Sequence, residues 1–236
     1  NQGTDARLMT KKKMKLLSEL AIYPLRIAFD HIQDRELYES RVRMAADNGI
    51  VHLSNYVLYN YDDTPKDLWE RLNININLNL ELGLTIYSFP MKYIPLNAKD
   101  RSFIDEPKWN WQYIRGVQRI LNVLKGTVMT TQDFFFRAFG ESAEEFVKIL
   151  YMPEKLLMNR GSSPGPEEKD WGRKFDKLTR GERQELLALL CANQKSSQLA
   201  IAYSALKNGK LKEILGYYID EAALKRRELP FFEDLN

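Results

Sequence analysis

The pattern of apolar and polar positions over the first 96 residues predicts helices alternating with strands. Apolar residues at helical spacing predict one helix over about 6–20 and another from Asp34 to Asn48-Gly49, where glycine ends a helix at little cost. Mostly apolar runs of strand length follow in PLRIAFDHI, VHLSNYVLYN and LTIYSFPMKYIPL. Strands that alternate with helices in this way predict a parallel sheet and an α/β fold.

One segment fits two patterns. The residues NININLNL, at 73–80, alternate strictly between polar and apolar, which is the period of a strand. Thr64-Pro65, however, is typical of a helix start, and Gly83 stands where a helix C-terminal cap would lie. Four apolar residues share one side of a helical wheel: Leu68, Leu72, Ile76 and Leu80. A strand here would leave two parallel strands without a crossover, so we predict a helix over Thr64–Leu82.

After Leu96 the pattern becomes helical. Helices are predicted over 111–124, 131–139, 142–159, 179–193, 196–207 and 211–227, with a Gly/Pro/Ser-rich linker at 160–170. Thr179 and Glu182 have the spacing of a capping box at the start of one of them. The chain therefore divides into a βα region at 1–97, a helical extension at 98–160, and a linker with C-terminal helices at 161–236.

Composition narrows the class of protein. The chain has 35 basic and 32 acidic residues and a net charge of +3, which permits a nucleic-acid partner without requiring one. No apolar run is long enough for a transmembrane helix, and the first residues lack the apolar core of a signal peptide, so we expect no membrane partner. A single cysteine excludes an internal disulfide and favours a reducing compartment, so cytoplasmic localisation is expected.

Polar residues gather where the predicted strands end. In parallel α/β barrels the chemistry lies at these carboxyl ends. The first end offers Asp30 and His31, and the second offers Ser54, Asn55 and Asn60. The third end offers Ser88, Lys92 and Tyr93. Because polar groups inside apolar strands are costly unless they are partnered, these residues are candidates for a site.

These segments resemble the radical SAM enzymes. NQGTDARL is similar to the end of that family's third barrel strand, PLRIAFDHI to the fourth strand and TIYSFPMKYIPL to the sixth. HLSNYVLYNYDDTPKDLWERL is similar to the fifth strand and its helix, with Asn60 and Tyr61 where many members carry glycine. The resemblance implies the later strands of a partial (β/α) barrel, followed by an all-α C-terminal region.

The resemblance also implies cofactors and site residues. Such enzymes bind a [4Fe–4S] cluster through a Cys-x-x-x-Cys-x-x-Cys motif, and S-adenosylmethionine is cleaved there to a 5′-deoxyadenosyl radical that abstracts a substrate hydrogen. By resemblance, the cofactor-binding residues would be Gln2, Asp5, Arg7, Asp30, Ser54 and Asn55. The residues facing an unknown substrate would be His31, Asn60, Ser88, Lys92 and Tyr93.

The cluster motif is absent from this sequence. Its one cysteine, Cys191, lies in an apolar helical run and is expected to be a buried structural residue. Our hypothesis is that the chain is the C-terminal portion of a longer enzyme and is inactive alone. Its partner would be the N-terminal half of the same protein, which carries the cluster. Exposed barrel edges would also favour a homodimer.

The alternative is a non-catalytic interaction or nucleic-acid-binding module formed by the helices after Leu96. Its candidate stacking residues are Trp109, Trp111, Phe134, Phe135, Phe136 and Phe139. At helical spacing, aromatic residues are more often part of a core. A complete barrel enzyme with acid–base chemistry is a third class, but the sequence offers no convincing pair of titratable residues for it.

Overall fold

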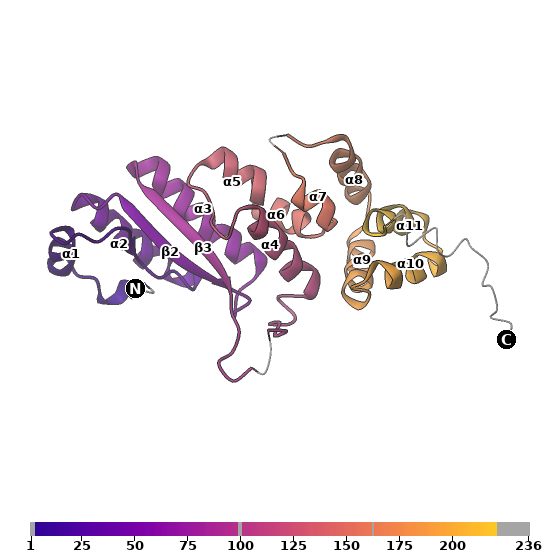
Figure 1. The fold of residues 1–236 in the computed structure, drawn as a ribbon, viewed down its shortest axis with the longest axis horizontal. Coiled ribbons are helices and arrows are strands. Elements are labelled where there is room, and N and C mark those ends of the chain that lie inside the picture. Colours follow the sequence, from indigo (N-terminus) through magenta and orange to yellow (C-terminus); the bar gives the residue numbers. More distant parts are fainter. Residues whose placement is uncertain (1–2, 99–100, 162, 221–236) are drawn as a thin grey trace, which may run out of the picture. The chain divides into compact units, whose positions relative to one another are not determined.

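The computed structural model describes residues 3–98, 101–161 and 163–220. The chain forms two compact units, Asn1–Leu150 and Tyr151–Asn236. The first unit contains a three-stranded parallel sheet with helices, and the described part of the second unit is helical (Figure 1). A mixed α/β fold with a helical C-terminal region is therefore confirmed. The first unit therefore contains the predicted βα region together with the first three helices that follow it.

The sheet has the order β1-β2-β3, with all strands parallel. Its strands are β1 (Leu25–Arg26), β2 (His52–Tyr59) and β3 (Thr85–Lys92). Thr4 forms a parallel bridge to Ile27 beyond β1, and Val128 forms an antiparallel bridge to Ser88 beyond β3. The strands therefore lie in chain order, as the alternating pattern predicted. Regular pairing in β1 is shorter than the predicted run, and a 3-10 helix follows at Ile32–Asp34.

The predicted helix over 6–20 is broken into two pieces. A 3-10 helix, Ala6–Leu8, is capped by the Asp5 carboxylate, which accepts a hydrogen bond from the Arg7 amide. The helix α1 (Lys11–Ser18) then begins at a second cap, where the Thr10 hydroxyl accepts from the Lys13 amide. Two capping side chains five residues apart therefore start two short helices in place of one.

The helix predicted over Thr64–Leu82 is confirmed as α3 (Pro65–Leu82). Thr64 and Asp67 form a capping box, and Gly83 ends the helix with φ 64°. Asn75 and Asn79 are buried against the sheet, and the Asn79 Oδ1 accepts from the Ile86 amide at 2.8 Å. The polar half of the alternating run is therefore split between the surface and the helix–sheet interface.

The helices α2 (Arg35–Asp47) and α3 pack on one face of the sheet, and β2 and β3 run in front of α3 in Figure 1. This interface is apolar, with buried residues that include Phe29, Val42, Leu53, Ile74 and Ile86. The opposite face, called here the open face, carries Arg26, Tyr56, Tyr87, Phe89 and Met91. These side chains are half-buried or exposed.

Three further helices complete the first unit: α4 (Trp111–Val123), α5 (Gln132–Phe139) and α6 (Ala143–Leu150). The Trp69 indole on α3 donates to the Gly140 carbonyl at 3.1 Å, and Gln112 Nε2 donates to the Leu150 carbonyl at 3.0 Å. The predicted helix over 142–159 is interrupted, since α6 ends before Pro153 and α7 (Glu154–Met158) follows it. Proline has no amide hydrogen to donate within a helix.

The described residues of the second unit form α7, a 3-10 helix (Gly216–Tyr218) and four more α-helices: α8 (Pro166–Asp176), α9 (Arg180–Ala192), α10 (Ser196–Ala205) and α11 (Gly209–Leu215). The helix α9 has the predicted capping box of Thr179 and Glu182. The helix α8 begins inside the predicted linker, with Pro166 in its first turn. The predicted helix over 211–227 ends as an α-helix at Leu215, and 221–227 lies outside the described residues. Across the described ranges, no helix is long and apolar enough to cross a membrane.

Candidate functional site

The three strands end at one side of the sheet because they are parallel. We call this side the carboxyl edge. It comprises residues 29–31 after β1, 60–63 after β2, 92–93 at the end of β3, and the described parts of the following loop, 94–98 and 101–110. Ligands of parallel α/β folds bind outside the carboxyl ends of the strands. Five residues predicted from the sequence lie at this edge: Asp30, His31, Asn60, Lys92 and Tyr93.

Asn60 joins the end of β2 to the end of β3 and to the loop that follows β3. Its side chain is fully buried. The Nδ2 group donates to the carbonyls of Tyr93 at 3.2 Å and Phe103 at 3.1 Å, and Oδ1 accepts from the Asp105 amide at 2.8 Å. These contacts use both ends of the amide inside the protein. The side chain, predicted to face a substrate, therefore positions the backbone around the edge.

A buried ion pair, which we call the edge clamp, lies beneath this region. The guanidinium of Arg71, on α3, is fully buried and donates to Asp63 Oδ2 at 2.5 Å. It also donates to the main-chain carbonyls of Asp30 at 2.6 Å and Phe29 at 3.3 Å. Asp63 Oδ1 accepts from the Trp109 indole at 2.9 Å. The edge clamp therefore fixes the end of β1, the loop after β2 and the start of α4 in one geometry.

Burial dominates the ionisation of the edge clamp. Burial raises the pKa of Asp63, while the hydrogen bond from the Tyr61 amide, the charge of Arg71 and the Trp109 indole act in the opposite direction. Burial also lowers the pKa of Arg71, against the attraction of Asp63 and Asp30. A buried charge needs such partners to remain ionised.

Sequence reasoning missed Arg71. A signal was present, because Asp67, Arg71, Asn75 and Asn79 recur every fourth residue and therefore form one polar row along a helix. The last three members of the row are buried in the structure. A polar row on a helix that packs against a sheet indicates a buried hydrogen-bond network.

Asp30 is a half-buried acid at the end of β1. Burial raises the pKa of its carboxyl group and nearby Asp34 adds to this effect, while Arg71, His31 and a hydrogen bond from the Leu58 amide act in the opposite direction. An acid held where its charged form is disfavoured is a common property of functional sites. Among the predicted cofactor-binding residues, Asp30 has the clearest electrostatic signature of this kind.

Four ring-bearing side chains line the carboxyl edge, and we call them the aromatic rim. They are His31, Tyr61, Tyr93 and Phe103. Ring centroids are 5.4 Å apart for His31 and Tyr61, 4.2 Å for Tyr61 and Tyr93, and 5.9 Å for Tyr93 and Phe103. Two predicted substrate-facing residues, His31 and Tyr93, therefore belong to one cluster. Lys92, beside them, donates from Nζ to the Arg101 carbonyl at 2.7 Å.

Asn55 and Ser88 lie on the helix-covered face of the sheet, away from this cluster. Asn55 Nδ2 donates to the Tyr38 hydroxyl at 3.1 Å, and that hydroxyl donates to Asn75 Oδ1 at 2.7 Å. Asn75 Nδ2 donates to Ser88 Oγ at 2.8 Å. Burial raises the pKa of Tyr38. The four side chains form a buried polar chain between the sheet and the helices, and the structure does not bring Asn55 or Ser88 to the carboxyl edge.

Ser54 lies on the open face beneath Arg26. Arg26 Nε donates to Ser54 Oγ at 3.3 Å, and Nη1 donates to the Tyr56 hydroxyl at 3.4 Å. The guanidinium carbon also lies 5.5 Å from the centroid of the Tyr56 ring. Adjacent strand residues point to opposite faces, which separates Ser54 from Asn55.

The predicted residues near the N-terminus are partly described. Asp5 and Arg7 bind each other, with Arg7 Nη2 2.8 Å from Asp5 Oδ2. The hydrogen bond from the Arg7 side chain holds the pKa of Asp5 below its usual range. Thr4, just before them, pairs with Ile27, so this segment follows β1 toward the carboxyl edge. Gln2 lies outside the described residues.

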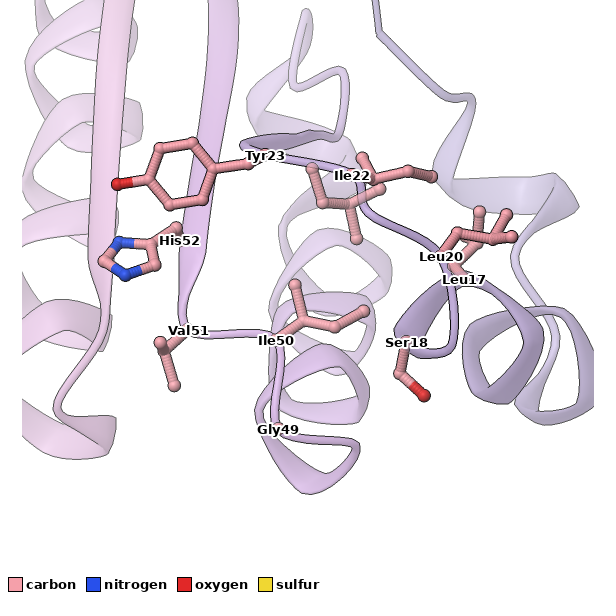
Figure 2. Close-up of a pocket in the computed structure, with 10 residues that line it drawn as sticks. Leu17, Ser18, Leu20, Ile22, Tyr23, Gly49, Ile50, Val51 and His52 are labelled. Carbon is pink, nitrogen blue, oxygen red and sulfur yellow. The ribbon is translucent and has the colours of Figure 1, made fainter.

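A hollow of about 190 Å³ lies at the other end of the sheet, where β1 and β2 begin. It is lined mainly by apolar side chains of α1 and of the segments that enter these two strands, including Leu17, Ile22, Leu25, Ile50 and Val51. Figure 2 shows the Tyr23 and His52 rings side by side, with centroids 4.7 Å apart. This hollow is remote from Asp30 and the aromatic rim along the strands, so it is a separate feature.

The donor set for an iron–sulfur cluster does not fit this chain. A [4Fe–4S] cluster is held by cysteine thiolates, and the sequence contains one cysteine. That residue, Cys191, lies half-buried on α9 of the second unit. Within the ranges that the structure describes, no group of three or more His, Cys, Asp and Glu side chains is arranged to hold a metal ion.

Comparison with known proteins identifies no relative of this chain. No protein-family model, curated protein or solved structure matches the chain. The function is therefore argued from the geometry of the sheet and from the residues at its carboxyl edge.

Proposed function

We propose that the first 97 residues are the later strands of a radical SAM partial barrel, and that the full-length protein is a radical SAM enzyme of unknown substrate. One observation carries the proposal: three parallel strands lie in chain order, with the connecting helices packed on one face. Consecutive strands of a (β/α) barrel have this arrangement, with helices outside and side chains of the other face inside.

The open face supports the same interpretation. Parallel sheets are usually covered on both faces. Here the open face carries Tyr87, 37% exposed, and Met91, 47% exposed, beside the polar pair of Arg26 and Ser54. The N-terminal half of the same protein is the proposed cover, since it would continue the barrel and bring the cluster cysteines. A second copy of the chain on an uncovered sheet edge is also proposed, and gel filtration showing only monomer would contradict that dimer.

In the family, the cluster and S-adenosylmethionine supply the radical that abstracts a substrate hydrogen. Because this chain has one cysteine, no step of that reaction is assigned to its residues. Their proposed role is to bind and orient. Asp30 would accept hydrogen bonds from ligand hydroxyl groups at the carboxyl edge. The edge clamp would hold the backbone of Asp30 in place through the contact from Arg71.

The experiment uses the product of the complete reading frame, reconstituted with iron and sulfide without oxygen. With dithionite as reductant, it is expected to convert S-adenosylmethionine to 5′-deoxyadenosine. The variant Asp30→Ala is expected to slow this conversion about tenfold or more, because a charged-group hydrogen bond contributes roughly 1.5–3 kcal/mol. Asp47→Ala, which changes an exposed acid at the far end of α2, is the matched control and is expected to keep the wild-type rate. A reading frame without a three-cysteine motif upstream of Asn1 would contradict the proposal.

The rival function, a nucleic-acid-binding module, finds less support in the first unit. Trp109, Phe135 and Phe139 are fully buried and belong to the core. Phe134 remains 44% exposed. Base stacking needs exposed rings, so burial removes three of the six predicted stacking residues. Affinity for single-stranded RNA that falls steeply with salt would restore this candidate.

A further inference from the structure

The hollow where β1 and β2 begin is an apolar recess that takes no part in the carboxyl edge. Its volume is about 190 Å³. Among the described residues, no Asp, Glu, Lys or Arg side chain lines it. Leu25, which is 1% exposed, belongs to the core of the first unit. Leu17, Ile22 and Ile50 pack against that core, so the hollow opens directly onto apolar side chains.

Backbone hydrogen bonds fix the wall of the hollow that joins α2 to β2. Gly49 has φ 77°, and its amide donates to the Ala46 carbonyl at 2.9 Å. The Ile50 amide donates to the Ala45 carbonyl at 3.0 Å. This pair of bonds is a Schellman cap, which turns the chain sharply at the end of a helix. The cap therefore holds Ile50 in the wall before any ligand binds.

The opposite wall is formed by the end of α1 and the turn that follows it. The Leu20 amide donates to the Leu17 carbonyl at 3.2 Å, and the Ile22 amide donates to the Leu20 carbonyl at 2.8 Å. The Ser18 hydroxyl donates to the Lys15 carbonyl at 2.7 Å, so it is already bonded within α1. This wall therefore offers a ligand mainly apolar surface.

The mouth of the hollow is also mostly apolar. Three side chains around it are exposed: Leu20 at 58%, Val51 at 41% and Tyr23 at 76%. Figure 2 shows Leu17 and Leu20 on one side of the hollow and Val51 and His52 on the other. Exposed apolar side chains around a concave apolar surface are typical of a ligand site.

We propose that this hollow is a second ligand site, which binds a small neutral apolar molecule of about six to eight carbon atoms. An apolar protein cavity of about 150 Å³ binds benzene, so the volume suits a ligand of this size. A neutral ligand is favoured because an ion loses its hydration in such a site and finds no opposite charge on the lining side chains. The inference does not depend on the proposed function, because the hollow lies at the opposite end of the strands from the carboxyl edge.

The test is an NMR titration of the amide signals of the 236-residue chain with toluene, 1-hexanol and benzoate. Toluene is expected to bind with a Kd of about 1 mM or below and to shift the Ile50 and His52 signals saturably. Benzoate carries a charge on a similar ring and is expected to bind at least about tenfold more weakly. The Asp30 and Tyr93 signals are expected to stay in place, which separates this site from the carboxyl edge.

A tryptophan at the mouth tests whether the hollow itself binds the probe. Val51→Trp is expected to weaken toluene binding about tenfold or more, because the indole would occupy the space that toluene needs. The matched control is Val123→Trp, the same substitution at a valine of α4 that is 47% exposed. It is expected to stay within about twofold of the wild type. If Val51→Trp does not fold by circular dichroism, Leu20→Trp on the opposite wall takes its place, with the same expected loss.

Binding of toluene alone supports a site for a ring, and binding of 1-hexanol supports a site for the end of an alkyl chain. Three results would overturn the inference: no saturable shift with either neutral probe, benzoate binding as tightly as toluene, or equal affinity for toluene in the mouth variant and in Val123→Trp. None of these results bears on the radical SAM proposal, which depends on iron in the complete protein.

Discussion

The edge clamp offers the sharpest test of the structure. Replacing Arg71 with methionine keeps an unbranched side chain of similar length and removes the guanidinium. Four hydrogen bonds disappear, to Asp63 Oδ2 and to the carbonyls of Phe29, Asp30 and Asp67. The Asp63 carboxylate, 5% exposed, then lies in the interior without its cationic partner.

The expected cost is large because the pair is buried. Removing one partner of a buried ion pair costs about 3–5 kcal/mol. In a unit of about 150 residues, each kcal/mol shifts the melting temperature by about 2–4 °C, so Arg71→Met is expected to lower it by about 6–20 °C. In the double variant Arg71→Met/Asp63→Asn, the amide removes the buried charge and can still accept from Trp109. We expect it to recover about 2 kcal/mol of that loss.

The assay is urea unfolding followed by tryptophan fluorescence in a Trp171→Phe background. The three remaining tryptophans, at 69, 109 and 111, all lie in the first unit, so the signal reports on the unit that contains the edge clamp. The matched control is Arg43→Met, which breaks the exposed ion pair with Glu81. Exposed pairs contribute little to stability, so the control is expected to keep the wild-type midpoint.

Two results would refute this reasoning. One is a loss below about 1 kcal/mol for Arg71→Met, the value of a solvated pair. The other is strict additivity of the two substitutions in the double variant, since residues in contact are expected to couple. Either result would mean that Arg71 and Asp63 are hydrated in solution and do not clamp the strand ends.

Three other predictions concern separate parts of the chain. Burial raises the pKa of Asp30, so the stability of the folded state falls as pH rises through that raised pKa. The melting temperature of Asp30→Asn should exceed that of the wild type at pH 7 and equal it near pH 3. Equal melting temperatures at both pH values would contradict this. Hydrogen bonds from Tyr217 and Lys174 lower the pKa of Asp170 to about 2. In Tyr217→Phe, the titration midpoint of the Asp170 carboxyl, followed by NMR, should move toward 3.8. An unchanged midpoint would exclude the contact. Gly116→Ala would place a Cβ 3.2 Å from the Leu150 backbone. It should lower the free energy of unfolding, measured in urea, by about 1–3 kcal/mol despite alanine's better helix propensity. A stabilised variant would rule out the close packing of α4 on α6.

Local signals predicted the parts of the fold that depend on near neighbours. The helix α3 was predicted in spite of its alternating sequence, because the capping residues Thr64 and Gly83 are local features. The capping box at Thr179 was predicted for the same reason. The break at Pro153 was missed although proline is a local signal, because the apolar spacing continued through it.

The candidate site was harder to predict because it depends on which face each strand residue occupies. Ser54 and Asn55 are neighbours in sequence and must point to opposite faces of the sheet. The sequence did not show which of them would meet the helices, and the structure places Asn55 there. The pairing of Arg71 with Asp63 joins a helix to a loop, and such a contact follows from tertiary packing more than from local pattern.

Asn60 shows how sequence and structure complement each other at one position. Its φ of 67° is a conformation that favours glycine. Asparagine tolerates that conformation better than most residues, and its side chain also makes three hydrogen bonds here. Asparagine therefore permits this backbone shape and also connects the end of β2 to the loop after β3.

The most direct test of the proposed radical SAM relationship is the iron and acid-labile sulfide content of the complete reading-frame product, reconstituted without oxygen. The predicted result is about four irons and four sulfides per chain. Absence of iron, together with a reading frame that has no three-cysteine motif upstream of Asn1, would contradict the relationship and leave the parallel sheet as a fold with another function.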